Sequence, residues 1–286
     1  MPRRNRGDGI QLKTPEQLDL MRLAGLVVAE ALEAMTTAAV PGASTADLDD
    51  VARAVLARNG ATSNFLGYHG YPATICASVN DRVVHGIPSR DEVLVDGDLL
   101  SIDFGAVVEG WHGDSAVTVA VGAVPDALAA LSQTTRRAMW DGIAAIRIGG
   151  HVTDISHAVE TSVRRAPGGD RYGIVENYGG HGIGTAMHME PHILNYGRPG
   201  HGAVLRPGMA LAVEPMLTLG DPATEELDDG WTVVTADGSP ASHWEHTVAL
   251  LPDGLWVLTA VDGGRAELEA RGAPVSARAV AASTIQ

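Results

Sequence analysis

The stretch "LLSIDFGAVVEGWHGDSAVTVAV", residues 99–121, decides the fold. Apolar runs on both sides of Glu109-Gly110 predict two antiparallel strands joined by a tight turn at that dipeptide. Because side chains alternate between the faces of a strand, this pairing places Asp103 and Asp114 on the same face. The sequence therefore predicts two neighbouring carboxylates within an apolar hairpin.

These two carboxylates have no basic residue close to them in the sequence. No Lys or Arg occurs between residues 91 and 135. An unpaired carboxylate is costly to bury, so bound cations are the natural partners of this pair. The alternative is that both acids lie on a solvated strand face.

A second copy of the same pattern follows later in the chain. The segment "VDGDLLSID" aligns without gaps on "RPGMALAVE", which matches Asp103 with Glu214. The segment around Asp114 parallels "WEHTVALL" around Glu245, and "PGASTADLDDVA" resembles "IGGHVTDISHAV". Ordered recurrence of several segments indicates an internal duplication, although short apolar strands also match by chance. Taken singly, Glu214 and Glu245 could each be a surface acid or a salt-bridge partner.

Helical segments precede the strands in both copies. Thr14, Pro15 and Gln17 predict a capped helix start, with the hydroxyl and the amide closing a capping box. The spacing of apolar residues predicts helices over four segments, at about 14–40, 45–57, 126–147 and 153–165.

The domain organisation follows from this order of elements. We expect an α+β fold, an antiparallel sheet covered by helices, built as two pseudo-symmetric halves. The predicted boundaries are an N-terminal segment 1–13, a main folded domain 14–262 with halves 14–125 and 126–262, and a mobile C-terminal tail 263–286.

Composition limits the class of protein. The chain has 286 residues and a formal net charge of −15 without a long basic stripe, which disfavours a nucleic-acid partner. One cysteine, Cys76, excludes an internal disulfide and suits a reducing compartment. No secretory signal and no run of about 20 apolar residues is present. We therefore expect a soluble, cytoplasmic protein with no membrane partner.

The segment "GGHGIGTAMHMEP", residues 179–191, adds His181 and His188 to the candidate residues. It is either a flexible surface turn or a preorganised site that glycines allow the backbone to approach closely. His181 and the four acids form a set of five ligands whose charge of −4 two divalent cations would balance. One imidazole among carboxylates suits Mn, Fe, Co or Zn, and such a pair of cations performs metal-assisted hydrolysis.

The order and spacing of "VVHGIP", "SIDFG", "HGDSA", "GGHGIG", "AVEPM" and "WEHT" resemble those of type I methionine aminopeptidases, metallopeptidases of the pita-bread fold. The resemblance covers roughly residues 11–262. It implies removal of the N-terminal methionine from nascent polypeptides when the second residue is small. It also implies two divalent cations, nascent N-termini as partners, at the ribosome or free of it, and a monomeric chain.

The resemblance also implies roles for individual residues. The family's metal ligands match Asp103, Asp114, His181, Glu214 and Glu245. Its two histidines that contact the scissile peptide match His85 and His188, and Glu214 also matches the residue that shuttles a proton of the nucleophilic water. The methionine pocket matches Tyr68, Tyr71, Cys76 and Trp231, and Met187 stands where many relatives have an aromatic residue. We expect His112, His243 and His246 to be structural.

Two other functions remain open at this point. A proline-directed aminopeptidase or dipeptidase has the same fold but usually a large N-terminal domain, whereas about 13 residues precede the first predicted helix. A non-catalytic pita-bread binding module typically lacks metal ligands, and all five are present in this sequence.

Overall fold

The helices and strands occur in the predicted order in the computed structural model, which describes residues 9–282. The helices are α1 Pro15–Ala38, α2 Thr45–Asn59, α3 Asp126–Ala144, α4 Val152–Arg165, α5 Arg265–Ala270 and α6 Ala277–Ala282, with 3-10 turns η1 Tyr68–Gly70 and η2 Gly169–Arg171. The strands before α3 are β1 Thr62–Ser63, β2 Ile75–Val79, β3 Arg82–Val84, β4 Leu99–Val108 and β5 Trp111–Ala120. Those after α4 are β6 Gly173–Ile174, β7 Gly180–Gly182, β8 Met189–Ile193, β9 Ala210–Val213, β10 Met216–Thr218, β11 Thr224–Glu226, β12 Val233–Thr235, β13 Ala241–His243, β14 His246–Leu251 and β15 Gly254–Val257.

The four helices predicted from apolar spacing are confirmed as α1 to α4, with ends displaced by a few residues. The start of α1 is the predicted capping box: the Thr14 hydroxyl accepts from the Gln17 backbone N–H, and the Gln17 side chain accepts from the Thr14 N–H. This box satisfies two amides that the first helical turn leaves unpaired.

The predicted hairpin is the pair β4–β5. Its register pairs Asp103 with Ala116 and Gly105 with Asp114, so the two aspartates share a face as expected. The turn residues Glu109 and Gly110 both have positive φ, the conformation that suits a two-residue hairpin turn between right-twisted strands. This register is confirmed over all ten residues of each strand.

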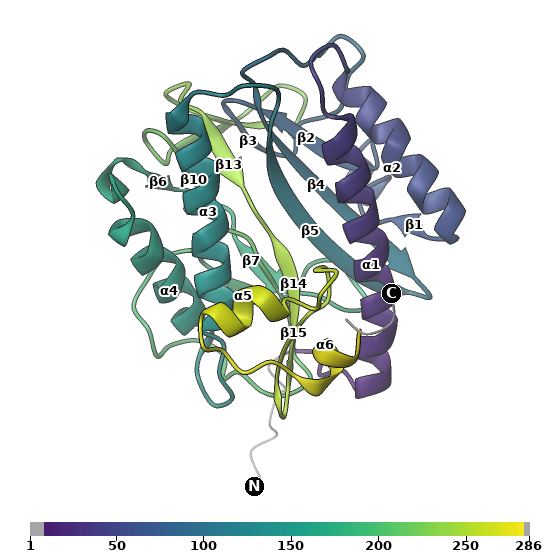
Figure 1. Ribbon diagram of the computed structural model, residues 1–286, viewed down its shortest axis with the longest axis vertical. Helices are drawn as coiled ribbons and strands as arrows, with labels where there is room; N and C mark the ends of the chain where they lie inside the picture. Colours follow the sequence, from purple (N-terminus) through teal and green to yellow (C-terminus); the bar gives the residue numbers. More distant parts are fainter. Residues whose placement is uncertain (1–8, 283–286) are drawn as a thin grey trace, which may run out of the picture.

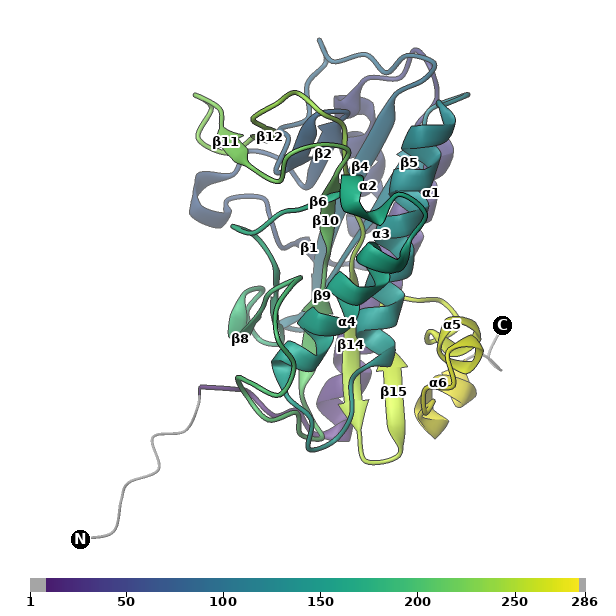
Figure 2. The ribbon, with the colours of Figure 1, turned by 90° about the vertical axis from the view of Figure 1, so that its left-hand side faces the viewer.

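All strand pairings in the named ladders are antiparallel, which confirms the α+β class. The first half forms β1-β4-β2 with β5 beside β4, and the second half forms β15-β14-β9-β7-β8. Two smaller sheets, β13-β10-β6 and β11-β12-β3, complete the fold, and β3 and β12 join the halves. In Figure 1, α1 and α2 lie over the β4–β5 side and α3 and α4 over the other half. Figure 2 shows the helices on one side of the strands and β8, β11 and β12 on the opposite side.

The two halves repeat the same hydrogen bonds at the start of a helix and the same isolated β-bridge. Ser44 caps α2 while its backbone N–H donates to Asp47, and the His151 N–H donates to Asp154 in the same way at the start of α4. Isolated β-bridges then join Ser44 to Val93 and His151 to Val204. These matching contacts support the two pseudo-symmetric halves expected from the repeated segments.

Helix α1 lies unusually close to the backbone of its neighbours. A Cβ at Gly25 would lie 2.2 Å from the Leu258 carbonyl oxygen, and one at Gly113 of β5 would lie 2.9 Å from the Gly25 nitrogen. The guanidinium of Arg22, 5% exposed, donates to the carbonyls of Leu258 at 2.7 Å and Val261 at 2.7 Å. Helix α1 of the first half is thus attached to a segment near the end of the second half.

The prediction of a mobile C-terminal tail is wrong for residues 263–282. This segment contains α5 and α6, and the side chains of Leu268 and Ala279 are completely buried. The segment has too few apolar residues for a recognisable periodicity, but those few pack against the domain. Residues 1–8 and 283–286 of the predicted terminal segments lie outside the described residues.

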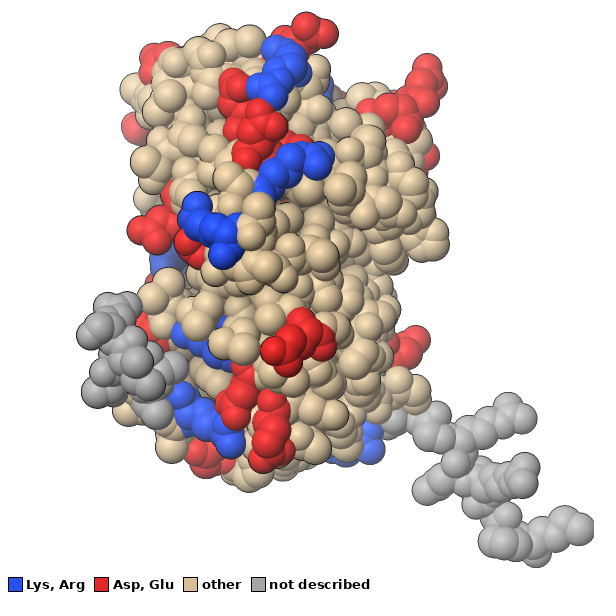
Figure 3. Space-filling view, turned by 90° about the vertical axis from the view of Figure 1, so that its right-hand side faces the viewer, with Lys and Arg blue, Asp and Glu red and all other residues tan. Residues whose placement is uncertain are grey.

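Charged side chains of both signs lie together on one face of the molecule. Figure 3 shows the side formed by α1 and α2, where basic and acidic side chains are interspersed. Arg58 of α2, for example, pairs with Glu30 of α1. None of the helices that the structure describes combines the length and the apolar character that a membrane span requires.

Replacing Gly25 by Ala tests the close approach of α1. Ala is the better helix former by about 1 kcal/mol, yet its methyl group would collide with the Leu258 carbonyl. We expect the Gly25→Ala variant to lose about 1–3 kcal/mol of the free energy of unfolding, measured by urea denaturation. The control is Thr36→Ala at an exposed position of the same helix, which should be neutral or slightly stabilising. A Gly25→Ala protein as stable as the control would contradict this packing.

Candidate active site

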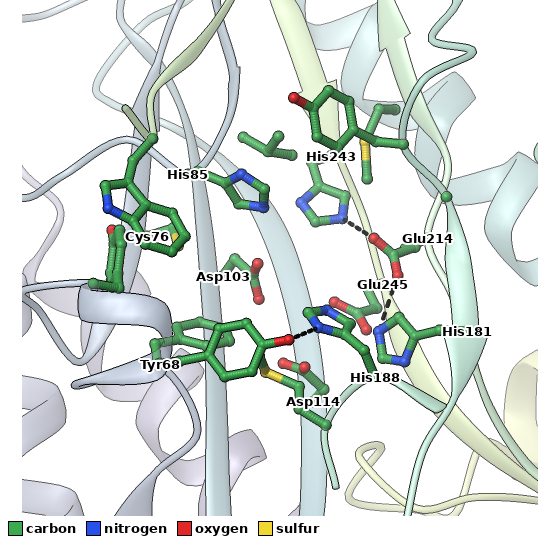
Figure 4. Close-up of a pocket in the computed structure, with 18 residues that line it drawn as sticks. Tyr68, Cys76, His85, Asp103, Asp114, His181, His188, Glu214, His243 and Glu245 are labelled. Carbon is green, nitrogen blue, oxygen red and sulfur yellow. Dashed lines mark hydrogen bonds and ion pairs between the residues drawn. The ribbon is translucent and has the colours of Figure 1, made fainter. Parts of the chain in front are cut away.

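One cavity of about 210 Å³ brings together all twelve residues that the sequence analysis assigns to the site. Figure 4 shows them around a common space between the two halves. Its lining includes the predicted residues Tyr68, Tyr71, Cys76, His85, Asp103, Asp114, His181, Met187, His188, Glu214, Trp231 and Glu245. It also includes Phe65, Val84, Tyr178, Gly179, Met216 and His243, which the sequence analysis did not select.

Four carboxylates lie at the centre of this cavity. Asp103 and Asp114 come from β4 and β5, Glu214 directly follows β9, and Glu245 directly precedes β14. The side chains of Asp114, Glu214 and Glu245 are buried, with 3%, 8% and 2% exposure. Asp103 Oδ1, Asp114 Oδ1 and Glu245 Oε1 are buried without a hydrogen-bond partner among the described residues. Such unsatisfied oxygens normally cost stability, so this cluster requires a partner.

Backbone contacts between the halves fix these acids. The Glu245 N–H donates to the Ala116 carbonyl at 2.9 Å, which attaches the second half to β5. The Thr247 hydroxyl accepts from the Asp114 N–H at 3.2 Å and donates to the Asp114 carbonyl at 2.8 Å. The acids of the two halves therefore face each other through direct hydrogen bonds between their strands.

The burial of these acids changes their proton affinity. Burial raises the pKa of Asp114 to about 7. Burial, with the charge of Asp114, raises the pKa of Asp103 well above its usual range. Burial and the neighbouring aspartates do the same for the pKa of Glu214 and the pKa of Glu245. A bound cation would oppose both causes, because it replaces water and neutralises the repulsion.

His181 lies on β7, between two glycines that the packing requires. A Cβ at Gly180 would lie 2.2 Å from the Ala212 oxygen, and one at Gly182 would lie 2.1 Å from the Glu190 oxygen. His181 Nδ1 lies 3.0 Å from the Gly182 carbonyl oxygen, which can only accept a hydrogen bond. The proton is therefore on Nδ1, which leaves the Nε2 lone pair directed to Glu214 Oε1 at 3.3 Å. Burial lowers the pKa of His181 to about 3, so the ring is neutral.

His188 and His85 also reach the cavity. His188 Nδ1 is 2.8 Å from the Tyr68 hydroxyl oxygen, and its ring centre is 4.5 Å from that of His181. His85 has a φ of 61°, an uncommon conformation for a residue with a side chain, and its ring packs edge-on against Tyr178 at 5.6 Å. Burial, with a smaller contribution from His188, lowers the pKa of His85 to about 4.

An apolar cluster forms the wall beside the carboxylates. Its buried members are Phe65, Tyr71, Ala73, Cys76 and Met187, with Tyr68, Ile87 and Trp231 packed against them. The rings of Tyr71 and Trp231 meet edge-on at 5.0 Å, and the Tyr71 hydroxyl donates to the carbonyl oxygens of Ile75 and Gly86 at 3.0 Å. Burial, and then the charge of Asp103, raises the pKa of Cys76, so the thiol is uncharged in this wall.

His243 differs from the expectation that it is purely structural. It lines the cavity, whereas His246 hydrogen-bonds to Thr259 at 2.8 Å and His112 is outside the cavity lining. The two-residue separation of His243 from Glu245 is the sequence signal that predicts this position, because residues i and i+2 of an extended chain share a face. Two trios of side chains have ligand atoms close enough for one cation each: Asp114, His181 and Glu245, and Glu214, His243 and Glu245.

Comparisons with known proteins agree with this geometry. The profile of metallopeptidase family M24 matches residues 19–251. Methionine aminopeptidase 1 of Mycobacterium tuberculosis is 58% identical over 245 residues, which cover 85% of this chain and 92% of the relative.

Solved structures give the same grouping. A methionine aminopeptidase from Thermotoga maritima superposes with a TM-score of 0.84 at 39% identity, covering 87% of this chain and 99% of that one. An Xaa-Pro dipeptidase from Bacillus anthracis superposes with a TM-score of 0.69 at 24% identity, covering 87% of this chain and 61% of that one, which shows only a shared fold. The chain therefore belongs to metallopeptidase family M24 and, within it, to the type I methionine aminopeptidases of the pita-bread fold.

Proposed function

We propose that this chain is a metal-dependent methionyl aminopeptidase that removes the N-terminal methionine from nascent polypeptides when the second residue is small. The observation that carries the proposal is that one cavity holds four carboxylates, three of them buried, beside a wall of aromatic and sulfur-containing side chains. The carboxylates suit cations and a terminal amine, and the wall suits a thioether side chain. The 58% identity to a methionine aminopeptidase supports the same activity.

The donor set of the cavity fits a pair of divalent cations. Four carboxylates and no Lys or Arg line it, and three of their oxygens lack a hydrogen-bond partner. We assign Asp103, Asp114, His181, Glu214 and Glu245 as ligands of two cations drawn from Co, Mn, Fe or Zn. When bound, such cations supply the chemistry of metal-assisted hydrolysis, in which a water becomes nucleophilic and a carbonyl is polarised.

The remaining polar side chains act on the substrate. When the Tyr68 hydroxyl donates a hydrogen bond to His188 Nδ1, the proton of the imidazole ring lies on Nε2. This N–H can then donate a hydrogen bond to the scissile carbonyl oxygen. His85 approaches the same space with a neutral ring. We assign Glu214, whose carboxylate lines the same cavity, as the group that shuttles a proton of the nucleophilic water.

The substrate's methionine side chain would lie against Tyr68, Tyr71, Cys76, Met187 and Trp231. Its terminal amine would then lie near the carboxylates.

The proline-directed alternative has weaker support, because the likeness to an Xaa-Pro dipeptidase extends to the fold alone. A non-catalytic binding role would leave the buried acids without a function. Since nascent chains are the substrates, we place the enzyme in the cytoplasm as a monomer, at the ribosome or free of it.

Cleavage of Met-Ala-Xaa peptides with defined metals tests the function directly. We expect the metal-loaded protein to release methionine, and Asp114→Asn or Glu245→Gln to abolish turnover and bind less metal, because an amide cannot replace the charge that balances a cation. Peptide cleavage followed by chromatography and metal content measured by mass spectrometry give both readouts. Glu33→Gln, at an exposed acid of α1, is the control and should match the wild type. Full activity with two metals in either site variant would refute the ligand assignment.

His188→Ala separates substrate contacts from metal binding. Loss of one donor to the transition state lowers the chemical rate by about 10²- to 10³-fold, while the bound metal should stay unchanged. Single-turnover kinetics and metal content measure the two effects. Tyr68→Phe, which removes only the hydroxyl beside Nδ1, should have a smaller effect on the rate. A collapse of metal content in His188→Ala would make His188 a ligand instead.

Met187 is expected to set the selectivity of the pocket. Loss of most of a buried apolar side chain costs about 1.5–3 kcal/mol, so peptides beginning with Met should be favoured over those beginning with Ala by roughly 10- to 150-fold in kcat/KM. Because a flexible Met187 adapts to other side chains, Met187→Phe should increase the preference for Met over Leu without changing metal binding. An unchanged ratio would show that residue 187 does not contact the substrate side chain.

A further inference from the structure

His243 carries a buried ring nitrogen that no contact within the protein explains. The residue is 2% exposed, and its Nε2 has no hydrogen-bond partner among the described residues. Buried polar atoms in native proteins nearly always have a partner. Figure 4 shows that the ring points into the cavity toward Glu214.

The backbone of His243 is fixed by the two strands that carry the aspartates. Its N–H donates to Ser101 Oγ of β4 at 3.2 Å and to Thr118 Oγ1 of β5 at 3.0 Å. The Thr118 hydroxyl in turn donates to the His243 carbonyl at 2.7 Å. The place of this residue at the cavity is therefore set by the same hairpin that positions Asp103 and Asp114.

Side chains on either side of Trp244 point to the cavity, whereas the Trp244 side chain points to the helix layer. Its indole N–H donates to Ser132 of α3 at 3.0 Å, in the helix layer rather than in the cavity lining. His243 and Glu245, one residue before and after it, both reach the cavity. The alternation brings an imidazole and a carboxylate of this segment into the same site.

The distance between His243 and Glu214 fits two ligands of one cation better than a hydrogen bond. His243 Nε2 lies 3.7 Å from Glu214 Oε2, too far for a hydrogen bond. Two ligands that each lie about 2.0–2.2 Å from one cation are separated by up to about 4.4 Å. His181 Nε2 lies 3.3 Å from the other oxygen, Glu214 Oε1, so an imidazole faces each oxygen of this carboxylate.

We propose that His243 is a sixth protein ligand of the metal centre, beyond the five that the family resemblance implies. Its ring nitrogen lies close enough to Glu214 and Glu245 for these three residues to hold one cation, and Asp114, His181 and Glu245 form a second such trio. Glu245 belongs to both trios. This inference rests on the proposed metallopeptidase function. An additional imidazole among the carboxylate ligands favours Zn, Co or Fe over Mn or Mg near His243.

The test compares cation binding by the wild type and His243→Gln, which keeps a polar side chain of similar length but removes the imidazole. Titration calorimetry of the metal-free proteins with CoCl₂ measures the two affinities, and the visible absorption of bound Co²⁺ reports its ligands. We expect His243→Gln to bind one of the two Co²⁺ ions at least about tenfold more weakly, with a changed spectrum. The matched control is His85→Asn, another cavity histidine that belongs to neither trio, which should bind both ions as the wild type does.

Each outcome bears on one of the two proposals. Wild-type isotherms and spectra in His243→Gln would overturn the assignment of His243 as a ligand, even if turnover fell. A folded His243→Ala variant, checked by circular dichroism, should show the same selective loss of one ion. If the wild type binds two Co²⁺ ions but cleaves no Met-Ala-Xaa peptide, the proposed function fails while the ligand assignment remains testable by binding alone.

Discussion

The main physical constraint on this structure is that four carboxylates, three of them buried, lie in a single cavity. Placing like charges together away from water is unfavourable, and it raises the pKa values of all four groups. The fold tolerates the cluster because backbone hydrogen bonds, not side-chain ion pairs, hold the acids. Thr247 binds both backbone groups of Asp114, and the Glu245 N–H donates to Ala116. The cost of this cluster is offset when cations occupy it, so binding and stability are linked.

The duplicated architecture is what brings these acids together. Each half supplies two acids from adjacent antiparallel strands and has its own apolar core, one built on α1 and α2 and the other on α3 and α4. A third apolar cluster, which includes Met21, Trp111 and Ala210, joins the halves. Helix α1 strengthens this junction through the close approach of Gly25 and the buried guanidinium of Arg22. The rigidity of the junction fixes the distances between acids of different halves.

Charged and apolar parts of the site lie on adjacent strands. Cys76 of β2 pairs directly with Asp103 of β4, so the apolar wall begins one strand away from the carboxylates. The hydrogen bond between Tyr68 and His188 connects that wall to the histidines. A substrate side chain held by this wall would have its backbone next to the acids, as the proposed cleavage of the bond after the first residue requires.

The sequence by itself determined the four long helices, the β4–β5 hairpin with its register, and the duplication, because each depends on local spacing of apolar, capping and turn residues. Its motifs also selected twelve residues that line one cavity. Only the tertiary structure decided which of the nearby histidines reaches that cavity, since His243 and His246 are three residues apart yet His246 turns to Thr259. It also decided that residues 263–282 pack against the domain through Leu268 and Ala279. Two apolar side chains are too few to form a periodic pattern in the sequence. Such features depend on contacts between segments distant in the chain, and local spacing carries no information about them.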